Sequence, residues 1–283
     1  MTAQEESSGV RCELCPHHCR IADGGVGLCA ARGNRGGKIV CMNYGKLTSI
    51  ALEPIEKKPL YHFHPHTPIL SVGSYGCNLL CPFCQNYEIS RAKDGDLRME
   101  VLSPEALAQL AADAHAQYGN IGVAFTYNEP LVSYEYVLDC AKLLRVQHLS
   151  VVLVTNGQIC AEPLARLLPY IDAMNIDLKG FTQSFYNWLG GDLETTKNAI
   201  QMAVASGVHV EVTTLVIPDK NDNEKEIDAE ARWLASISKN IPIHLSRYFP
   251  RYHCDIPMTP VATLQRLEQI AKAHLTYVHL GNV

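Results

Sequence analysis

The sequence has no long hydrophobic run and no excess of positive charge. None of its 283 residues belong to a stretch approaching the roughly 18 consecutive apolar residues that a membrane-spanning helix needs. The opening residues, MTAQEESSGV, are polar and acidic, and they have neither the basic nor the apolar region of a secretory signal peptide. The formal net charge is −5, which does not indicate a basic surface for nucleic acid or anionic membranes. These absences predict a cytoplasmic globular protein that binds neither nucleic acid nor membrane.

Cysteine, in contrast, is abundant. The chain has 11 cysteines, and eight of them precede residue 85. Disulfides are not expected in a reducing cytoplasm, so clustered cysteines indicate metal or redox chemistry. Cys140, Cys160 and Cys254 stand alone later in the chain and are expected to be small buried side chains.

From residue 69 onward, short apolar runs alternate with helical stretches. The predicted strands are residues 69–73, 121–126, 150–155, 173–178, 208–216 and 241–246. The predicted helices are residues 103–119, 131–148, 161–171, 193–207, 224–239 and 260–274, and the end of the chain could add a closing strand. Strands that alternate with helices imply right-handed crossovers and a parallel sheet. Six such units predict an α/β fold, a partial (β/α)6 barrel of the TIM type, where a complete barrel would have eight.

Residues 1–68 differ from this pattern and are predicted to form a separate unit that precedes the barrel of residues 69–283. Residues 11–38 are rich in Cys, Gly and Arg without any period, which indicates a small knuckle held together by bound ligands. Residues 39–52 alternate in polarity around a Tyr-Gly pair, which predicts a β-hairpin. Residues 53–68, EPIEKKPLYHFHPHTP, are irregular, and they predict either a charged surface linker or a loop that walls a pocket.

A cysteine motif, C-x3-C-x2-C, directly follows the first predicted strand of the barrel. It consists of Cys77, Cys81 and Cys84. In parallel α/β folds, functional residues gather at the carboxyl ends of strands. Three thiolates can hold three irons of a [4Fe–4S] cluster and leave the fourth iron open to a small molecule. A zinc site is the alternative, but zinc normally takes four closed ligands and no second cysteine pair lies nearby in the sequence. The spacing favours the cluster.

This motif, placed after the first strand of a partial barrel, resembles the radical S-adenosylmethionine (radical SAM) superfamily over essentially all of residues 69–283. The resemblance implies that the amino and carboxylate groups of SAM chelate the open iron. It implies reductive cleavage of SAM to methionine and a 5′-deoxyadenosyl radical, which abstracts a hydrogen atom from the substrate. The cofactor carries this chemistry while the protein orients and shields it. The resemblance also implies an oxygen-sensitive, anaerobic enzyme and a low-potential electron donor of the flavodoxin or ferredoxin type.

The segment FTYNEP, residues 125–130, lies where the family usually has a GGEP-like stretch that meets the SAM amino group. Tyr127 and Asn128 replace the two glycines, and Glu129 remains. The resemblance therefore assigns Tyr127, Asn128 and Glu129 to SAM, with Glu129 as the main contact. The alternative is an exposed turn that precedes a helix.

Two further segments, VTNGQ (residues 154–158) and NIDLKG (residues 175–180), resemble stretches of glycyl-radical-enzyme activases that hold the methionine portion and ribose of SAM. The resemblance assigns Asn156, Asp177 and Lys179 to SAM. Asp177 and Lys179 are two positions apart on a strand and so face the same way. For Lys179, a salt bridge at the end of the strand is the alternative.

The segment HLSRYFPRYH, residues 244–253, ends the sixth predicted strand. Arg247 or His244 is expected to meet the SAM carboxylate or the substrate. Related activases often have a histidine where Phe249 stands, so this part of the chain departs from their pattern.

Four segments together resemble a narrower group, the radical SAM member of the AmmeMemoRadiSam system, which is related to pyruvate formate-lyase activating enzymes. They are CELCPHHCRIADGGVGLCAARGN, EPIEKKPLYHFHP, GCNLLCPFCQNYEIS and TYNEP. The resemblance implies Memo-like and Ammecr-type protein partners and leaves the substrate unidentified. A glycyl-radical-enzyme activase is the alternative, although simple activases begin near the cysteine motif. A non-catalytic zinc or iron–sulfur protein is the third hypothesis.

The knuckle contains Cys12, Cys15, Cys19 and Cys29. Four thiolates could close a tetrahedral zinc site that folds a segment too small to fold alone. A second iron–sulfur cluster is the next alternative, followed by unligated cysteines. Cys41 lies on a predicted strand and is expected to pack there.

Overall fold

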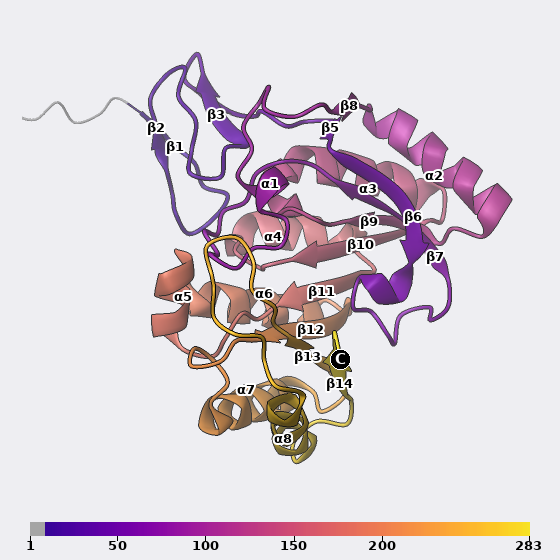
Figure 1. The fold of residues 1–283 in the computed structure, drawn as a ribbon. Helices are drawn as coiled ribbons and strands as arrows, with labels where there is room; N and C mark the ends of the chain where they lie inside the picture. The colour runs from indigo at the N-terminus through magenta and orange to yellow at the C-terminus, as the bar shows by residue number, and fades with distance from the viewer. Residues whose placement is uncertain (1–8) are drawn as a thin grey trace, which may run out of the picture.

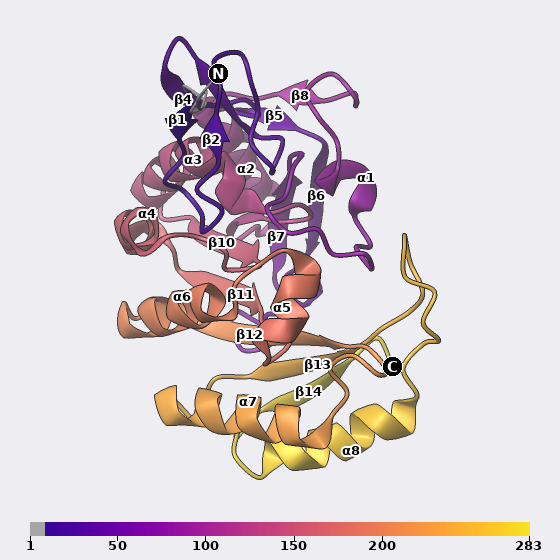
Figure 2. The same cartoon turned by 90° about the vertical axis from the view of Figure 1, so that its left-hand side faces the viewer.

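The computed structural model describes residues 9–283, and its main feature is an eight-stranded sheet in the order β14-β13-β12-β11-β10-β9-β7-β6. The strands are β6 (Ser49–Pro54), β7 (Pro68–Gly73), β9 (Gly122–Phe125), β10 (Ser150–Thr155), β11 (Ala173–Asp177), β12 (His209–Val216), β13 (Ile243–Arg247) and β14 (Val278–Gly281). From β7 to β14 every neighbouring pair is parallel, whereas β6 runs antiparallel to β7. The parallel strands follow one another in chain order, so the sheet curls in one direction, as Figures 1 and 2 show.

Helices cover the outer face of the curved sheet (Figures 1 and 2). They are α2 (Pro104–Tyr118), α3 (Tyr134–Val146), α4 (Ala161–Leu167), α6 (Leu193–Ala205), α7 (Glu224–Ile237) and α8 (Val261–Lys272). Each of them connects two successive parallel strands, which confirms the predicted partial barrel of six strand–helix units, with β14 as a closing strand. Within residues 9–283, no helix has both the length and the apolar character to cross a membrane.

Local sequence signals explain where the helices begin and end. The Ser103 hydroxyl accepts a hydrogen bond from the Ala106 N–H at 3.2 Å, and Pro104 occupies the first helical position of α2. Gly119 ends the same helix in the left-handed conformation. Two short helices, α1 (Tyr87–Ser90) and α5 (Gln183–Leu189), were not predicted because they are too short to show a helical period.

Three small two-stranded sheets lie outside the barrel. They pair β1 (Val10–Arg11) with β2 (Arg20–Ile21), β3 (Arg32–Arg35) with β4 (Lys38–Cys41), and β5 (Lys46–Leu47) with β8 (Glu100–Val101). The hairpin predicted over residues 39–52 is therefore wrong in position, because the observed hairpin joins β3 to β4. Gly36 and Gly37 both have positive φ, as the tightest hairpin turns require. Residues 49–54 instead form β6, so the large sheet begins before residue 69.

The acidic residues 1–8, which were predicted not to be a signal peptide, lie outside the described part of the chain.

Candidate active site

A cavity of about 660 Å³ lies inside the curve of the sheet. The loop between β7 and α1, residues 74–86, is called the cluster loop here, and it contributes Cys77, Cys81 and Cys84 to the cavity wall. The segments that follow β9, β10 and β11 contribute most of the other predicted site residues, namely Tyr127, Asn128, Glu129, Asn156, Asp177 and Lys179. The structure thus brings the predicted residues together at the carboxyl ends of adjacent strands, where parallel α/β folds place their sites.

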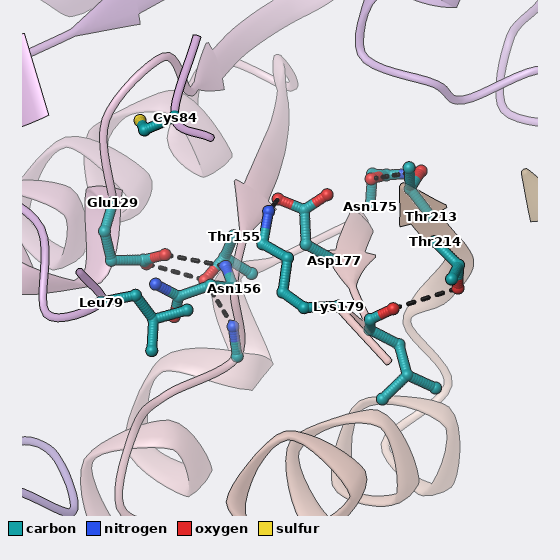
Figure 3. Close-up of polar contacts among 12 residues, drawn as sticks. Leu79, Cys84, Glu129, Thr155, Asn156, Asn175, Asp177, Lys179, Thr213 and Thr214 are labelled. Carbon is teal, nitrogen blue, oxygen red and sulfur yellow. Dashed lines mark hydrogen bonds and ion pairs between the residues drawn. The ribbon is translucent and has the colours of Figure 1, made fainter. Parts of the chain in front are cut away.

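Glu129 is held by three hydrogen bonds inside this wall. Its side chain accepts bonds from the Leu131 N–H at 3.0 Å, the Thr155 hydroxyl at 2.7 Å and the Asn156 N–H at 2.7 Å. Figure 3 shows the carboxylate aimed at Thr155 and Asn156. Burial raises the pKa of Glu129 to about 7, although these hydrogen bonds lower it. Glu129 is 3% exposed, so the alternative of an exposed turn does not hold. A buried carboxylate with a raised pKa is stabilised in its charged form by a cation, such as an ammonium group.

Tyr127 lies at a position where the family that the cysteine motif resembles usually has glycine. Its φ is +70°, in the left-handed region that glycine adopts most readily. Its hydroxyl donates to Glu53 at 2.6 Å, and the Lys58 ammonium lies 4.7 Å from the centre of its ring. Its carbonyl accepts a hydrogen bond from Asn86 of the cluster loop at 2.7 Å. Tyr127 therefore connects the cluster loop to residues that precede the barrel.

Asn128 is engaged with the backbone of the cluster loop. Its side-chain oxygen accepts a bond from the Ser74 N–H at 2.9 Å, and its amide donates to the carbonyls of Tyr75 and Gly76. Through these bonds the asparagine fixes the approach to Cys77. Its side chain supports the loop directly and could affect a cofactor only through the loop.

Asn156 joins the end of β10 to the same loop. Its side-chain amide donates to the Asn78 oxygen at 2.9 Å and lies 3.7 Å from the Cys77 sulfur. Its side-chain oxygen accepts from the Gln158 N–H at 2.9 Å. The side chain is thus fixed within reach of both the first cysteine and the pocket.

Asp177 and Lys179 form an ion pair at 2.8 Å at the end of β11 (Figure 3). Burial lowers the pKa of Lys179, but the negative charges of Asp177, Cys81 and Cys84 raise it above its usual value. Burial in turn raises the pKa of the Cys81 thiol to about 11, against the lowering effect of Lys179. The Lys179 ammonium therefore supplies positive charge where thiolates would need it.

The donor set fits an iron–sulfur cluster better than a single ion. Among residues 9–283, no three His, Cys, Asp or Glu side chains are arranged to hold one metal ion as they stand. A cluster is larger than an ion and takes thiolates that stand further apart. Three cysteines from one loop with a pocket beside them fit such a cluster.

Arg247 is placed differently from the other predicted residues. Its Nε donates to the Thr259 carbonyl at 2.7 Å, and its guanidinium lies 5.0 Å from the centre of the Phe249 ring. It is not among the residues that line the cavity, whereas His244 is. Of the two residues considered at the end of β13, the structure places only His244 in the pocket wall.

Sequence reasoning missed the far end of the cavity, where a buried glutamate closes the barrel. Glu211, in β12, is fully buried. Its carboxylate accepts bonds from the N–H groups of Tyr61 and His62 at 3.1 and 2.8 Å, and from the Nε2 atoms of His209 and His244 at 3.0 and 2.7 Å. Burial would raise the pKa of Glu211, but these hydrogen bonds lower it to about 2. The one available signal was a glutamate in the middle of the apolar run VHVEVTTLV.

Residues 55–62, called the floor segment here, cross this end of the barrel. Lys58, Pro59 and Tyr61 line the cavity, and Lys58 is 2% exposed. Asn175 of β11 donates to the Pro59 carbonyl at 2.8 Å. The interpretation of this segment as a pocket wall therefore describes it better than a surface linker does.

The knuckle has a separate, small cavity of about 10 Å³. Its lining includes all four predicted ligands, Cys12, Cys15, Cys19 and Cys29. None of these cysteines forms a disulfide. Cys41, at the end of β4, is half-buried and lies outside this lining.

Comparisons with known proteins agree with this arrangement. The sequence model of the family described as the Radical SAM superfamily matches residues 71–234. The chain is 37% identical to an uncharacterized protein of Methanocaldococcus jannaschii, over 98% of this chain and 83% of that protein. It is 26% identical to the pyruvate formate-lyase-activating enzyme of Clostridium pasteurianum, over 59% of this chain and 67% of that enzyme. A solved radical SAM methyltransferase from Sphaerobacter thermophilus shares the fold, with a TM-score of 0.56 and 20% identity over 77% of this chain and 67% of that one.

Proposed function

Because the chain belongs to the radical SAM superfamily and is an enzyme of that family, we propose that it binds a [4Fe–4S] cluster through Cys77, Cys81 and Cys84 and cleaves SAM reductively there. When bound, the cluster and SAM supply a 5′-deoxyadenosyl radical that abstracts a hydrogen atom from a substrate not yet identified. One observation carries this proposal: the three thiols share a cavity with Glu129, Asn156 and Lys179.

The residues at the strand ends would bind and orient SAM. Ionised Glu129 offers a buried negative charge for the SAM ammonium, and its three hydrogen bonds keep the carboxylate in one orientation. Asn156, fixed between the cluster loop and β10, offers its amide beside the first cysteine. Asp177 and Lys179 add a polar pair for the methionine portion or the ribose.

The opposite end of the cavity would receive the substrate. The floor segment crosses this end, and Glu211 and Asn175 hold it in place through hydrogen bonds. Polar groups of Lys58, Thr213 and His244 face this end of the pocket. They offer hydrogen bonds to a substrate while the apolar strand residues shield it.

Within the superfamily, we place the chain in the AmmeMemoRadiSam type. The floor segment and the TYNEP stretch line the cavity, and the knuckle is hydrogen-bonded to the cluster loop; these are segments that carry the resemblance. This placement implies Memo-like and Ammecr-type proteins as partners. It also implies a flavodoxin or ferredoxin type of electron donor.

A second candidate is an activase that installs a glycyl radical on a partner enzyme. The similarity to the pyruvate formate-lyase-activating enzyme of Clostridium pasteurianum favours it. The two functions differ in the fate of the radical. An activase would leave a protein-based glycyl radical on its partner, visible by electron paramagnetic resonance, whereas the AmmeMemoRadiSam type would not.

The test is anaerobic reconstitution with iron and sulfide, followed by addition of dithionite and SAM. We expect the wild-type chain to release 5′-deoxyadenosine and methionine, measured by chromatography, and Cys77→Ala to release neither. Cys140→Ala is the matched control, because Cys140 is buried in α3 outside the cavity. Equal yields from the wild type and Cys77→Ala would refute the proposal, as would the absence of product from a reconstituted wild type.

A further inference from the structure

Four thiols of the N-terminal segment meet around one small space, although they come from different turns of the chain. The Cys12 N–H donates to the Cys19 carbonyl at 2.9 Å, which joins the two ends of the first turn. Cys15 lies within that turn, and Cys29 comes from the next one. Cys12 and Cys29 are each 6% exposed. The small cavity of about 10 Å³ is lined by all four side chains.

The knuckle has little regular structure of its own. Its strands β1 and β2 are two residues long, and β3 and β4 are four residues long. Segments this small usually require a disulfide or a metal to fix their turns. Since none of the four cysteines is in a disulfide, a metal bound by thiolates is the crosslink that their chemistry allows.

The knuckle and the residues that follow β4 contact the cluster loop on both sides of Cys77. Asn43, which follows β4, donates to the Tyr75 carbonyl at 2.9 Å. His17 Nε2 is hydrogen-bonded to the Asn78 carbonyl at 2.7 Å.

Between these two bonds the backbones approach closely. Gly76 has a φ of +90°, and a Cβ atom at this position would lie 2.4 Å from the Cys29 carbonyl oxygen. Only a glycine fits at this distance. The backbone that presents Cys77 is therefore in contact with the knuckle at Gly76 and Asn78, and with Asn43 at Tyr75.

We propose that Cys12, Cys15, Cys19 and Cys29 bind a metal centre through four thiolates, and that this centre fixes the cluster loop around Cys77. A zinc ion and an iron–sulfur cluster share this thiolate chemistry. No three of the described Cys, His, Asp or Glu side chains surround a single ion as they stand, so either centre would move the two turns: zinc would draw the thiolates together, and a cluster would widen the cavity of about 10 Å³. In either case the centre is separate from the one at which SAM is proposed to react.

The first test is the zinc and iron content of the full chain, measured after anaerobic purification. A variant with Cys77, Cys81 and Cys84 all changed to Ala lacks the thiols of the cluster loop, so its remaining metal reports on the knuckle. We expect one zinc or about four irons per chain in this variant. We expect that metal to be lost when Cys12→Ser and Cys29→Ser are added. X-ray absorption separates the two metals, since zinc bound by four thiolates has Zn–S distances of about 2.3 Å.

Absence of zinc and iron from the first variant would overturn the metal centre, and so would metal that survives the added serines. Because this experiment is done without the cluster-loop thiols and without SAM, its failure would leave the proposed radical chemistry untouched. Equally, a chain that releases no 5′-deoxyadenosine could still hold metal in the knuckle.

The second test concerns the contact between the knuckle and the cluster loop, and it uses His17→Ala in the otherwise native chain. This change removes the hydrogen bond to the Asn78 carbonyl but keeps the four thiols of the knuckle and the three thiols of the cluster loop. We expect the knuckle metal to be retained, while iron is lost from the cluster loop to a chelator several-fold faster than in the wild type. The matched control is His148→Ala, at the exposed end of α3. An unchanged rate of iron loss would show that the knuckle does not fix the cluster loop. Loss of the knuckle metal would overturn the four-thiolate ligand set.

Discussion

At the scale of single residues, chemistry here depends on which partners a buried carboxylate has. Glu129, Glu211 and Glu230 are all buried, yet their pKa values are shifted to about 7, about 2 and about 8. Burial raises all three, and the number of hydrogen-bond donors decides how far that effect is reversed. The same residue type thus offers a cation site, a permanently ionised anchor and a neutral acid within one barrel.

Glu129→Gln is expected to weaken SAM binding by about tenfold to hundredfold, because a hydrogen bond to a charged group contributes about 1.5–3 kcal/mol. The change keeps the shape of the side chain and removes its negative charge. The measurement is the Kd of SAM for the anaerobically reconstituted protein at pH 8, where Glu129 is mostly ionised. Glu162→Gln, on the exposed face of α4, is the control and should bind SAM like the wild type. Unchanged affinity in Glu129→Gln would remove the residue from the SAM site.

Glu230 is a buried acid that must hold its proton. The Thr214 hydroxyl lies 2.5 Å from the Glu230 carboxyl and 3.0 Å from the Leu178 carbonyl, and it has one hydrogen to donate. The consistent arrangement is that protonated Glu230 donates to Thr214, which donates to Leu178 (Thr214 is shown in Figure 3). Burial, which raises the pKa of Glu230 to about 8, favours this neutral form.

Glu230 should therefore make the free energy of unfolding depend on pH. Its pKa is raised from 4.5 to about 8 in the folded chain, so both states are protonated below pH 4.5. Between pH 4.5 and about 8 only the unfolded chain ionises, which lowers stability by up to about 1.4 kcal/mol per pH unit. Above that range the folded chain also loses the proton and the slope disappears. The free energy of unfolding, measured with urea at pH values from 5 to 8, should fall less steeply with pH for Glu230→Gln than for the wild type. An equal dependence on pH in the two proteins would contradict a protonated Glu230.

At the scale of elements, the floor segment depends on a strand that is distant in sequence. The bond from the Tyr61 N–H to Glu211 spans 150 positions, and the one from His62 spans 149. The carboxylate of Glu211 is the acceptor for both backbone donors. Because neither donor belongs to a helix or strand, Glu211 of β12 supplies the hydrogen bonds that a regular element would otherwise provide.

Glu211→Gln should release this segment. A glutamine has one acceptor oxygen in place of two, so at least one of the two part-buried N–H groups loses its partner, and the cost is at most about 1–3 kcal/mol for each unsatisfied group. Hydrogen exchange should become faster at the amides of Tyr61 and His62, and the urea midpoint should fall. Glu224→Gln, in the exposed first turn of α7, is the control and should change neither. Protection of both amides in Glu211→Gln would show that the anchor lies elsewhere.

Separation along the chain also distinguishes what the sequence could predict from what it could not: local features were predicted, and contacts between distant segments were not. Strands β7 and β9 to β13 and the six long helices follow from periodicity and caps, which are local signals, and their positions were predicted within a few residues. Most of the strand β6 was read as one arm of a hairpin over residues 39–52, and only the fold reveals that β7 is its partner. The cysteines and Glu129 were found because they belong to short motifs. Glu211 was missed as an anchor, since its role comes from contacts between distant segments.

At the scale of the whole molecule, the sheet has two unpaired edges, β6 and β14, and the floor segment connects the regions beside them. His62 Nε2 and His279 Nε2 are hydrogen-bonded at 2.8 Å, and the His62 ring lies 4.4 Å from the Tyr277 ring. His279 belongs to β14, whereas His62 follows β6 in the chain. The strands therefore do not close into a complete barrel, but side-chain contacts connect the two edges of the sheet. The cavity is lined by residues from the beginning, middle and end of the chain.

This arrangement predicts how SAM should stabilise the protein. The cavity wall includes residues from Glu53 to Asn282, so unfolding of any part of the barrel would destroy the binding site. A ligand at 100 times its Kd then raises the free energy of unfolding by about 2.7 kcal/mol, for the barrel as one unit. Thermal unfolding of the anaerobically reconstituted chain should shift upward by roughly 5 °C with SAM, with slower hydrogen exchange in both β7 and β13. The variant that lacks Cys77, Cys81 and Cys84 should show no such shift. An equal shift in that variant would place SAM away from the cluster loop, and protection confined to β7 and β9 would mean that the two halves of the barrel unfold independently.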